Sequence, residues 1–347
     1  MVNAIAKELV LRKDEFTNQV VETIYFGGGT PSVLSVAEIR FLLTTVYQNY
    51  TVIEVPEITL EANPDDLDDK KIDELAASPV NRLSIGIQSF FDDDLKLMNR
   101  AHSASEAKKS LQYAARYFDN ISIDLIYGIP GMSNTKWLEI IKMALSFGVP
   151  HISSYALTVE PKTALKKLIA TGKIAEPTDD AASEHFEILV ETLTNEGFIH
   201  YELSNFGKEN YFSKNNSSYW LGKKYLGVGP SAHSFNGTSR SWNVSNNALY
   251  IKSIQGDVLP NEIEILTITD QYNEYVMTGL RTIWGIAIDK VTHEYGLQYK
   301  EYLLKRAKKF IDDGLLLNDK NVIKTSKKGK FLSDGIASDL FMLNLDV

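Results

Sequence analysis

The first half of the chain alternates short apolar runs with segments of helical periodicity. The apolar runs span residues 20–26, 58–61, 82–88, 121–127 and 151–157, and helical patterns at 36–47, 68–77, 105–118 and 134–147 lie between them. Strands separated by a helix have enough chain between them to cross over and pair in parallel. The pattern therefore predicts an α/β fold built on a parallel sheet, preceded by an amphipathic helix within residues 1–16.

Polar residues at strand ends favour a barrel over an open sheet. Glu61, Gln88 and Asp124 interrupt three of the runs at or near their C-terminal ends. Barrel active sites are assembled from several such strand ends, so we expect a full or partial barrel. An open doubly wound sheet is the alternative fold, and solvated strand ends without a function are the alternative interpretation of the polar residues.

The second half of the chain has a different pattern. A long helix is predicted over 178–196, followed at 198–250 by a stretch rich in aromatic and turn-forming residues that is too apolar for disorder and too irregular for a helix. Helical segments return from residue 270, and a hairpin at 314–324 followed by a helix from 327 indicates a winged-helix-like module. We therefore expect three parts, at 1–165, 166–262 and 263–347.

Three consecutive glycines follow the first predicted strand, in the sequence YFGGGTPS at 25–32. Such a loop lets the backbone approach a ligand and exposes amides that bind a carboxylate or phosphate, although a plain glycine turn is an equal alternative. It matches neither Walker A nor the dinucleotide fingerprint.

Glu61 and Asp124 could accept from ligand hydroxyl or ammonium groups, and Gln88 and Arg100 could donate to carboxylate or carbonyl groups. Taken alone, each of these four is better explained by contacts with neighbouring loops.

Composition excludes several functional classes. The chain has no cysteine, which excludes disulfides, thiolate zinc sites, a cysteine nucleophile and a thiolate-bound iron–sulfur cluster. Its 6 histidines lack metalloprotease spacing, and no G-x-S-x-G elbow occurs. The net charge of −9 argues against nucleic-acid binding, and no apolar run is long enough to form a transmembrane segment.

Five motifs, taken together, resemble a known family. FGGGTPS at 26–32, EANP at 61–64, RLSIGIQSF at 82–90, NRAH at 99–102 and DLIYGIPG at 124–131 are similar, in this order, to the radical S-adenosylmethionine (SAM) proteins related to oxygen-independent coproporphyrinogen III oxidase. QSF at 88–90, ELSNF at 202–206 and the stretch at 219–229 resemble the heme chaperones of this family more than the oxidase. The resemblance covers nearly the whole chain.

This resemblance implies a partial (β/α)6 radical SAM barrel that holds S-adenosyl-L-methionine at its C-terminal face. By the same resemblance, Gly28, Gly29 and Thr30 contact the methionyl end of the cofactor. The other cofactor-binding positions of the family fall on Glu61, Gln88, Arg100, Asp124 and, as a looser match on the last strand, Ala156.

The iron–sulfur cluster is where the sequence departs from the family. The family holds its [4Fe-4S] cluster in a CxxxCxxC loop after the first barrel strand, upstream of the helix with which this chain opens, and the chain contains neither that strand nor a cysteine. We therefore expect a barrel that lacks its first strand because the sequence is truncated at the N-terminus, with a cluster-free relative as the alternative. Without a cluster, reductive cleavage of SAM has no electron source.

The heme-associated motif of the chaperones, His-Asn-x-x-Tyr, reads NNSSY at 215–219. Asparagine cannot replace imidazole as an axial ligand of heme iron. The resemblance leaves Asn216, Tyr219 and the nearby His233 as candidate heme contacts, with His200 as a further histidine of the same stretch. The aromatic residues there could form a flat pocket for a planar ligand or ordinary packing between domains, and composition does not separate the two.

These implications lead to one main functional hypothesis and two alternatives. The main hypothesis is a cytoplasmic heme chaperone with a SAM site, which passes heme to an acceptor protein and takes electrons from an unknown donor. The first alternative is an oxygen-independent coproporphyrinogen III oxidase of porphyrin biosynthesis. The second is a DNA-reading winged helix, which the acidic charge disfavours.

Overall fold

The computed structural model describes residues 1–16, 18–161 and 163–343 of the chain. The chain forms two compact units, one of Met1–Val21, Glu38–Glu54 and Lys214–Val347, the other of Glu22–Ala37 and Val55–Ser213. The division into three parts at 1–165, 166–262 and 263–347 stays a prediction.

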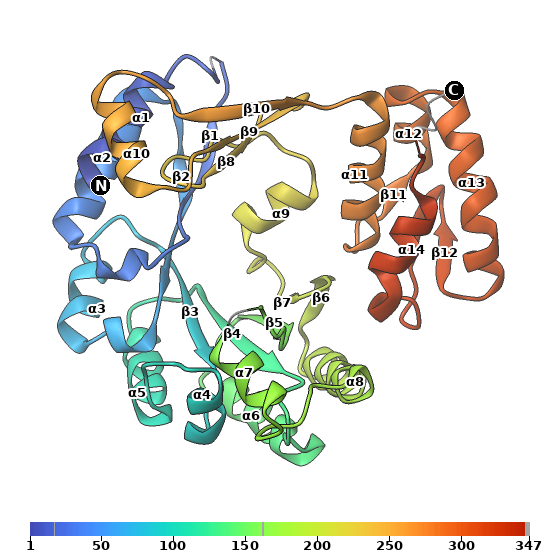
Figure 1. Cartoon of the computed structure of the whole chain (residues 1–347), viewed down its shortest axis with the longest axis horizontal. Coiled ribbons are helices and arrows are strands. Elements are labelled where there is room, and N and C mark those ends of the chain that lie inside the picture. Colours follow the sequence, from blue (N-terminus) through green and yellow to red (C-terminus); the bar gives the residue numbers. More distant parts are fainter. Residues whose placement is uncertain (17, 162, 344–347) are drawn as a thin grey trace. The chain divides into compact units, whose positions relative to one another are not determined.

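A seven-stranded sheet with the order β1-β2-β3-β4-β5-β7-β6 organises the second unit (Figure 1). Its strands are β1 (Val21–Phe26), β2 (Val52–Ala62), β3 (Arg82–Gln88), β4 (Ile121–Tyr127), β5 (His151–Ala156), β6 (Ile199–Glu202) and β7 (Asn205–Gly207). From β2 to β5 the strands pair in parallel, whereas β7 is antiparallel to both β5 and β6. The sheet curls without closing, so the predicted α/β fold with a partial barrel is confirmed.

Helices follow the parallel strands as the alternating pattern predicts. They are α3 (Asp69–Ala76), α5 (Ala104–Ala114), α6 (Asn134–Ser146), α7 (Ala164–Ala170) and α8 (Asp179–Asn195). Ser103 and Glu106 form a capping box at α5, and Thr178 caps α8. The sequence pattern missed α4 (Asp92–Leu97), which is too short for helical periodicity and begins with three aspartates that suit a helix N-terminus.

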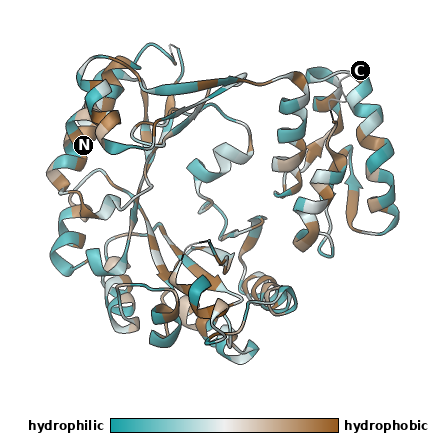
Figure 2. Cartoon of the chain, viewed as in Figure 1, coloured by the Kyte–Doolittle hydropathy of each residue, from teal (hydrophilic) through white to brown (hydrophobic). Residues whose placement is uncertain are grey.

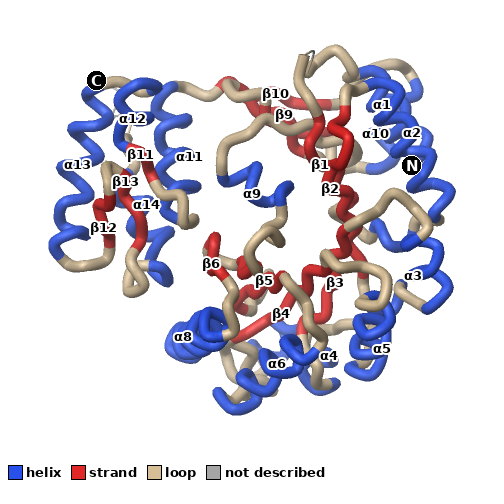
Figure 3. The backbone as a smooth tube through the Cα atoms, turned by 180° about the vertical axis from the view of Figure 1, so that it is seen from behind, coloured by secondary structure: helices blue, strands red, loops and turns tan. Residues whose placement is uncertain are grey.

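The two faces of the sheet differ in chemistry. Alternate side chains of a strand point to opposite faces, and one set is apolar and fully buried: Leu60, Leu83, Ile85, Ile123, Leu125 and Ile152. The other set is polar and consists of Glu61, Arg82, Ser84, Ser122, Asp124, His151 and Ser153. Both ribbon views show α4, α5 and α6 along one side of β3 and β4, and Figure 2 shows the hydrophobic residues gathered in these strands (Figures 1 and 3). The helices therefore cover the apolar face, and the polar face is left for other contacts.

The stretch at 198–250 is more regular than the sequence suggested. Its first part forms β6 and β7 of the large sheet, and its remainder, from Lys214 in the other unit, contains a short helix α9 (Lys214–Trp220), the strands β8 (His233–Phe235) and β9 (Ser239–Asn243), and the start of α10 (Asn247–Gln255). With β10 (Asn261–Ile265) the two strands form an antiparallel sheet of order β10-β9-β8. The prediction that this stretch is too irregular for a helix is therefore wrong for α9, a helix of 7 residues that interrupts a loop-rich region.

A buried carboxylate fastens the first helix to this segment. Glu8 of α1 (Val2–Leu11) is 0% exposed and accepts hydrogen bonds from the backbone N–H of Gly229 at 2.8 Å, Asn243 Nδ2 at 2.7 Å and the Tyr250 hydroxyl at 2.6 Å. Arg12 pairs with Glu8 at 3.2 Å. Four donors thus converge on one side chain, and we call this group the Glu8 cluster.

The C-terminal part has the predicted combination of helices and a hairpin. Its helices are α11 (Ile268–Leu280), α12 (Ile288–Glu294), α13 (Leu297–Asp312) and α14 (Ser333–Leu340), and its sheet has the order β11-β13-β12, formed by Ile286–Ala287, Val322–Thr325 and Leu316–Asp319. The hairpin turns at Lys320 and Asn321, whose positive φ values of 48° and 68° suit a tight hairpin turn. The remaining helix, α2 (Val36–Asn49), precedes β2. Among the described residues, no helix has the length and apolar character needed to span a membrane.

Candidate functional site

The glycine-rich segment forms an open loop after β1. Gly28 and Gly29 have φ values of +73° and +63°, in the left-handed region that glycine adopts without strain. A Cβ atom on Gly27 would lie 2.5 Å from the Tyr25 ring, so this position also requires glycine. All three glycines and Thr30 are exposed. The loop therefore presents its backbone at the end of the strand, as the sequence predicts.

Glu61, the penultimate residue of β2, is tied to this loop. Its carboxylate accepts a hydrogen bond from the Tyr25 hydroxyl at 2.7 Å and another from the backbone N–H of Gly28 at 3.0 Å. Burial and the neighbouring Glu61 charge raise the pKa of Tyr25, which keeps the phenol in its donating form. Glu61 is therefore a fixed acceptor beside the exposed glycine loop.

Gln88 and Arg100 converge over Gly86 on β3. Gln88 ends the strand with a φ of 64°, at a point where the pairing register with β4 shifts. Arg100 Nη2 donates to the carbonyl oxygen of Gly86 at 3.3 Å and to Asn63 Oδ1 at 3.4 Å. A Cβ on Gly86 would lie 2.9 Å from both Arg100 Nη2 and Gln88 Nε2, so glycine makes room for these two donors. The site thus has a cationic, donor-rich side.

Asp124 lies in the middle of β4 rather than at its end, directly opposite Ser153 of β5. Burial and the Glu61 charge raise the pKa of Asp124 to about 7, and a hydrogen bond from Ser153 and the charges of Arg82 and Arg100 only partly offset this. A half-buried carboxyl group with a pKa near neutrality is typical of functional sites, although structural networks also produce one.

The structure brings most of the predicted residues onto the polar face of one sheet. Glu61 contacts Gly28, Gln88 lies beside Arg100, and the charges of Glu61 and Arg100 both act on Asp124. Gly29, Thr30 and Ala156 are exposed at strand ends, and within the described part of the chain none of them hydrogen-bonds to these four side chains. Ala156 ends β5 in register with Tyr127.

The sequence analysis did not predict several residues that contact the candidate side chains in this site. Tyr25 and Asn63 lie inside the motifs YFGGGTPS and EANP, so the signal was present but their contacts were not foreseen. Ser153 lies outside every motif quoted for the resemblance, and only the pairing register of β4 and β5 places it beside Asp124.

The residues on this face fit SAM but not an iron–sulfur cluster. Exposed loop amides and the Gln88 and Arg100 donors suit a carboxylate, and Glu61 suits ammonium or hydroxyl groups. The chain has no cysteine, and among the described residues no group of three His, Asp or Glu side chains could hold a metal ion. These residues therefore supply no ligand set for a [4Fe-4S] cluster.

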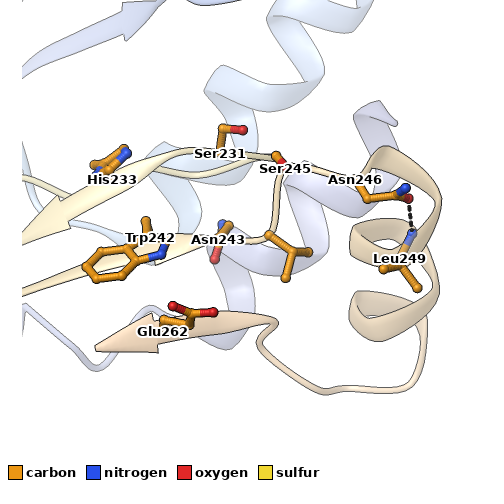
Figure 4. Close-up of a pocket in the computed structure, with 9 residues that line it drawn as sticks. Ser231, His233, Trp242, Asn243, Ser245, Asn246, Leu249 and Glu262 are labelled. Carbon is orange, nitrogen blue, oxygen red and sulfur yellow. Dashed lines mark hydrogen bonds between the residues drawn. The ribbon is translucent and has the colours of Figure 1, made fainter. Parts of the chain in front are cut away.

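A second candidate site lies on the β10-β9-β8 sheet. His233, Trp242 and Glu262 form one row across the three strands, in direct register. The row lines a cavity of about 400 Å³ whose other walls come from Ser231 before β8, from the chain between β9 and α10, and from Leu249 of α10 (Figure 4). The His233 side chain is exposed, and its ring centre lies 6.1 Å from that of Trp242.

The other heme candidates lie elsewhere. Asn216 and Tyr219 belong to α9 and do not line this cavity; Tyr219 is 43% exposed and packs edge to face on Tyr225 at 4.5 Å. His200 is buried, stacks on Phe206 at 4.1 Å and has its Nε2 atom 3.0 Å from the carbonyl oxygen of Leu203. His200 is therefore a core residue rather than an accessible ligand.

Comparisons with known proteins agree with this architecture. The model of the Radical SAM superfamily matches residues 4–144, and that of the HemN C-terminal domain matches residues 266–332. Among solved structures, coproporphyrinogen III oxidase (HemN) from Escherichia coli superposes with a TM-score of 0.82 at 23% identity and covers 98% of this chain and 82% of its own length, which shows a shared fold.

Curated relatives are similar over almost the whole chain. The heme chaperone HemW of Lactococcus lactis subsp. lactis (strain IL1403) is 32% identical over 96% of this chain and 88% of that protein. HemW of Bacillus subtilis (strain 168) is 32% identical over 96% and 89%. The mouse radical S-adenosyl methionine domain-containing protein 1, mitochondrial, is 32% identical over 92% of this chain and 75% of its own length. On this sequence likeness and the shared radical SAM fold, the chain belongs to the HemW family of radical SAM proteins.

Proposed function

We propose that this chain is a cytoplasmic heme chaperone that binds SAM on the polar face of its sheet, binds heme, and passes the heme to an acceptor protein. The names of the curated relatives support the chaperone activity. The single observation that supports a SAM site best is the convergence of Glu61, Gln88 and Arg100 beside an exposed glycine loop.

In this proposal each residue of the site has a distinct task toward SAM. The backbone of Gly28, Gly29 and Thr30 receives the methionyl end, and Gln88 and Arg100 donate to its carboxylate. The carboxyl groups of Glu61 and Asp124 hydrogen-bond to polar groups in the rest of the SAM molecule. Ala156 flanks the bound molecule at the end of β5. SAM supplies a sulfonium centre when bound. Because the sequence has no cysteine and the described residues supply no other ligand set for an iron–sulfur cluster, no cleavage of SAM and no electron donor enters the proposal.

Binding measurements with matched controls test the SAM site. We expect SAM to bind the wild-type chain in isothermal titration calorimetry, and Glu61→Gln and Arg100→Ala to weaken binding at least tenfold, because a hydrogen bond to a charged group is worth about 1.5–3 kcal/mol. Glu54→Gln, at the far end of the same strand, and Arg116→Ala, an exposed arginine after α5, serve as controls that should bind as the wild type does. Equal binding by all four variants would exclude this site.

For heme, we propose the cavity beside His233. An exposed imidazole can bind heme iron, and Trp242 beside it offers a flat surface to a porphyrin ring. Asn216 and Tyr219 on α9 are secondary candidate contacts, since asparagine stands where the family motif has histidine.

A hemin titration followed by visible absorbance tests the heme site. His233→Ala should abolish the spectrum of a nitrogen-ligated heme, whereas His293→Ala, which removes an exposed histidine of α12, should leave it unchanged. An unchanged spectrum in His233→Ala would mean that heme binds elsewhere, and Tyr219→Phe would then test the α9 candidate.

The fold shared with the Escherichia coli oxidase supports one alternative, an oxygen-independent coproporphyrinogen III oxidase. Loss of two carboxyl groups from coproporphyrinogen under anaerobic, reducing conditions would support it. Stoichiometric heme binding without turnover of coproporphyrinogen would exclude it.

A further inference from the structure

The two outer strands of the β10-β9-β8 sheet differ in how their edges are covered. The β8 edge is covered, because Phe235 and Tyr225 exchange two backbone N–H···O hydrogen bonds of 2.9 Å. β10 pairs with β9 on one side and, in the described part of the chain, with no strand on the other (Figures 1 and 3). An uncovered edge of this kind is a place where another extended chain can add to a sheet.

The hydrogen bonds to β9 identify the backbone groups of β10 that point outward. The N–H of Val244 donates to the carbonyl oxygen of Pro260 at 2.9 Å, and the N–H of Leu266 donates to the carbonyl oxygen of Thr238 at 3.0 Å. Hydrogen-bonded and non-hydrogen-bonded pairs alternate along an antiparallel ladder, so the even-numbered residues of β10 bond to β9. The odd-numbered residues direct their N–H and C=O groups away from β9, and they are Asn261, Ile263 and Ile265. Within the described residues, these outward groups have no hydrogen-bond partner.

The side chains of β10 form an apolar and an acidic set. Ile263 and Ile265 are 67% and 81% exposed, and the residues opposite them on β9 are serines. Isoleucines this exposed leave apolar area for a further chain to cover. Glu262 and Glu264 point to the opposite face of the strand, are exposed, and form no ion pair with a described residue. β10 thus presents apolar side chains, negative charge and unpaired backbone groups together.

The charges argue against a second copy of this chain on the edge. Two copies of β10 that pair in antiparallel fashion through their outward groups are centred on residue 262, 263 or 264. With the centre at 263, Glu262 of each copy lies opposite Glu264 of the other, and with the centre at 262 or 264 a glutamate lies opposite its own counterpart. Like charges directly opposite each other destabilise a strand pair, so the glutamates disfavour self-association.

Charge and alternation define the strand that does fit. Lysine or arginine opposite Glu262 and Glu264 forms favourable cross-strand pairs, and apolar residues opposite Ile263 and Ile265 cover the exposed isoleucines. Because successive side chains of a strand point to opposite faces, such a segment has basic and apolar residues in alternation. Its backbone pairs with the outward N–H and C=O groups of β10.

The uncovered edge adjoins the cavity that is proposed for heme. Glu262 lies in one row with Trp242 and His233, and all three line that cavity. A strand added to β10 lies about 4.8 Å beyond it, so the residue opposite Glu262 becomes the next member of the row. A protein held on this edge therefore places a side chain at the wall of the cavity.

We propose that β10 is the docking edge for the heme acceptor, which adds an extended segment of alternating basic and apolar residues as a fourth strand of the β10-β9-β8 sheet. The acceptor then lies beside the cavity from which it takes heme. The identity of the partner as a heme acceptor rests on the proposed function, whereas the chemistry of the added strand rests on β10 alone.

Peptide binding to the heme-free chain tests the docking edge. The probe is a fluorescent, end-blocked peptide in which lysine and valine alternate, and fluorescence polarisation measures its binding. One control peptide has the same composition with its lysines grouped at one end, and another has glutamate in place of lysine. We expect the alternating lysine peptide to bind at least about tenfold more tightly than either control. Equal binding of the two lysine peptides would overturn the inference, because the net charge of −9 alone would then attract them.

Ile263→Pro tests the backbone pairing without a change of charge. The N–H of Ile263 points outward, so proline removes a donor that the added strand needs and leaves the ladder to β9 intact. We expect binding of the alternating lysine peptide to weaken about tenfold. Ile263→Val keeps the N–H and a branched apolar side chain, and should bind as the wild type does. Wild-type affinity in a folded Ile263→Pro variant, checked by circular dichroism, would overturn the inference.

Glu264→Lys tests the charge and keeps the test valid if the proline variant does not fold. It should weaken binding of the alternating lysine peptide and strengthen binding of the glutamate peptide. Glu301→Lys makes the same charge change at an exposed position of α13, and should change neither affinity by more than about twofold. An unchanged peptide preference in Glu264→Lys would contradict the proposed charge pairing.

Sedimentation and hemin binding separate the remaining outcomes. A wild-type dimer that Ile263→Pro dissociates would overturn the inference, because a second copy would then occupy the edge. Ile263 does not line the heme cavity, so Ile263→Pro should give the wild-type hemin spectrum. If the alternating lysine peptide binds but hemin does not, the docking edge holds and the proposed chaperone function fails. If hemin binds but the peptide does not, the proposed function stands and the docking edge fails.

Discussion

Replacing Glu8 by glutamine tests the Glu8 cluster with almost no change of shape. The substitution keeps one carbonyl oxygen and turns the other acceptor into an NH2 group. Both oxygens of Glu8 now face donors, with Arg12 and Asn243 at Oε1 and Gly229 and Tyr250 at Oε2. If the NH2 group takes the place of Oε1, two N–H donors lose their acceptor, and if it takes the place of Oε2, the Gly229 N–H loses its acceptor while the Tyr250 hydroxyl can turn to accept. The Arg12 guanidinium also loses the buried negative charge that pairs with it.

The expected loss of stability follows from the contacts that are broken. One or two hydrogen bonds to a charged group at about 1.5–3 kcal/mol each give about 1.5–6 kcal/mol, and breaking a buried ion pair by removing one partner costs about 3–5 kcal/mol by mutational precedent. These two figures describe overlapping contacts and are not added. We therefore expect Glu8→Gln to lower the free energy of unfolding by about 3–5 kcal/mol.

Urea unfolding followed by far-UV circular dichroism measures this loss, and Lys7→Ala is the matched control on the same helix. Lys7 pairs with Asp257 at 2.9 Å, but the two side chains are 36% and 68% exposed. An exposed pair contributes at most about 1 kcal/mol, so the control should unfold close to the wild type. A Glu8→Gln variant within about 1 kcal/mol of the wild type would refute the reasoning, because the cluster would then contribute no more than a surface contact.

Three further substitutions have definite expected outcomes in the same urea assay. The effect of Asp124→Asn on the free energy of unfolding grows with pH: the wild-type pKa is raised from 3.8 to about 7, so ionisation opposes folding progressively as pH rises between these values. The variant should therefore equal the wild type near pH 4 and exceed its stability by up to about 4 kcal/mol at pH 8; a constant difference would contradict the assigned pKa. Gly28→Ala should lower the free energy of unfolding by about 1–2 kcal/mol, because an alanine there has to adopt a positive φ. Gly256→Ala is the control: the φ at Gly256 is −86°, so the free energy of unfolding should not change. Trp137→Phe should lower the free energy of unfolding by about 1–3 kcal/mol, because the indole N–H donates to the carbonyl oxygen of His185 at 2.8 Å in the core. An unchanged urea midpoint would mean that water replaces this donor.

The accuracy of the sequence predictions depended on local signals. β3 and β4 match the predicted strands residue for residue, because apolar residues alternate along them and Gly128 marks the end of β4. β2 was predicted only at 58–61 but runs from Val52 to Ala62. Glu54 and Pro56 interrupt the apolar pattern in its first half, and strand pairing through the backbone does not require apolar side chains there.

In the candidate site, too, the sequence predicted what has a local signal and missed what depends on strand pairing. Motifs identified Glu61, Gln88, Arg100 and Asp124 one at a time, because each lies in a short run of distinctive residues. Their mutual contacts were not predictable, since they depend on the register of parallel strands and on the shift at Gln88. The hydrogen bond from Ser153 to Asn205 depends on an antiparallel strand that joins the sheet about 50 residues later, and no local pattern encodes that pairing.

The Glu8 cluster also bears on how the chain is made. The partners of Glu8 at Gly229, Asn243 and Tyr250 follow it by 221, 235 and 242 residues. At a synthesis rate of about 5–20 residues per second, the ribosome reaches them about ten to fifty seconds after Glu8. A helix of 10 residues is marginal on its own in water, and its charged residue has no buried partner during that interval. This helix is thus held back from its final environment until the 221 to 242 residues that separate Glu8 from these partners have been added.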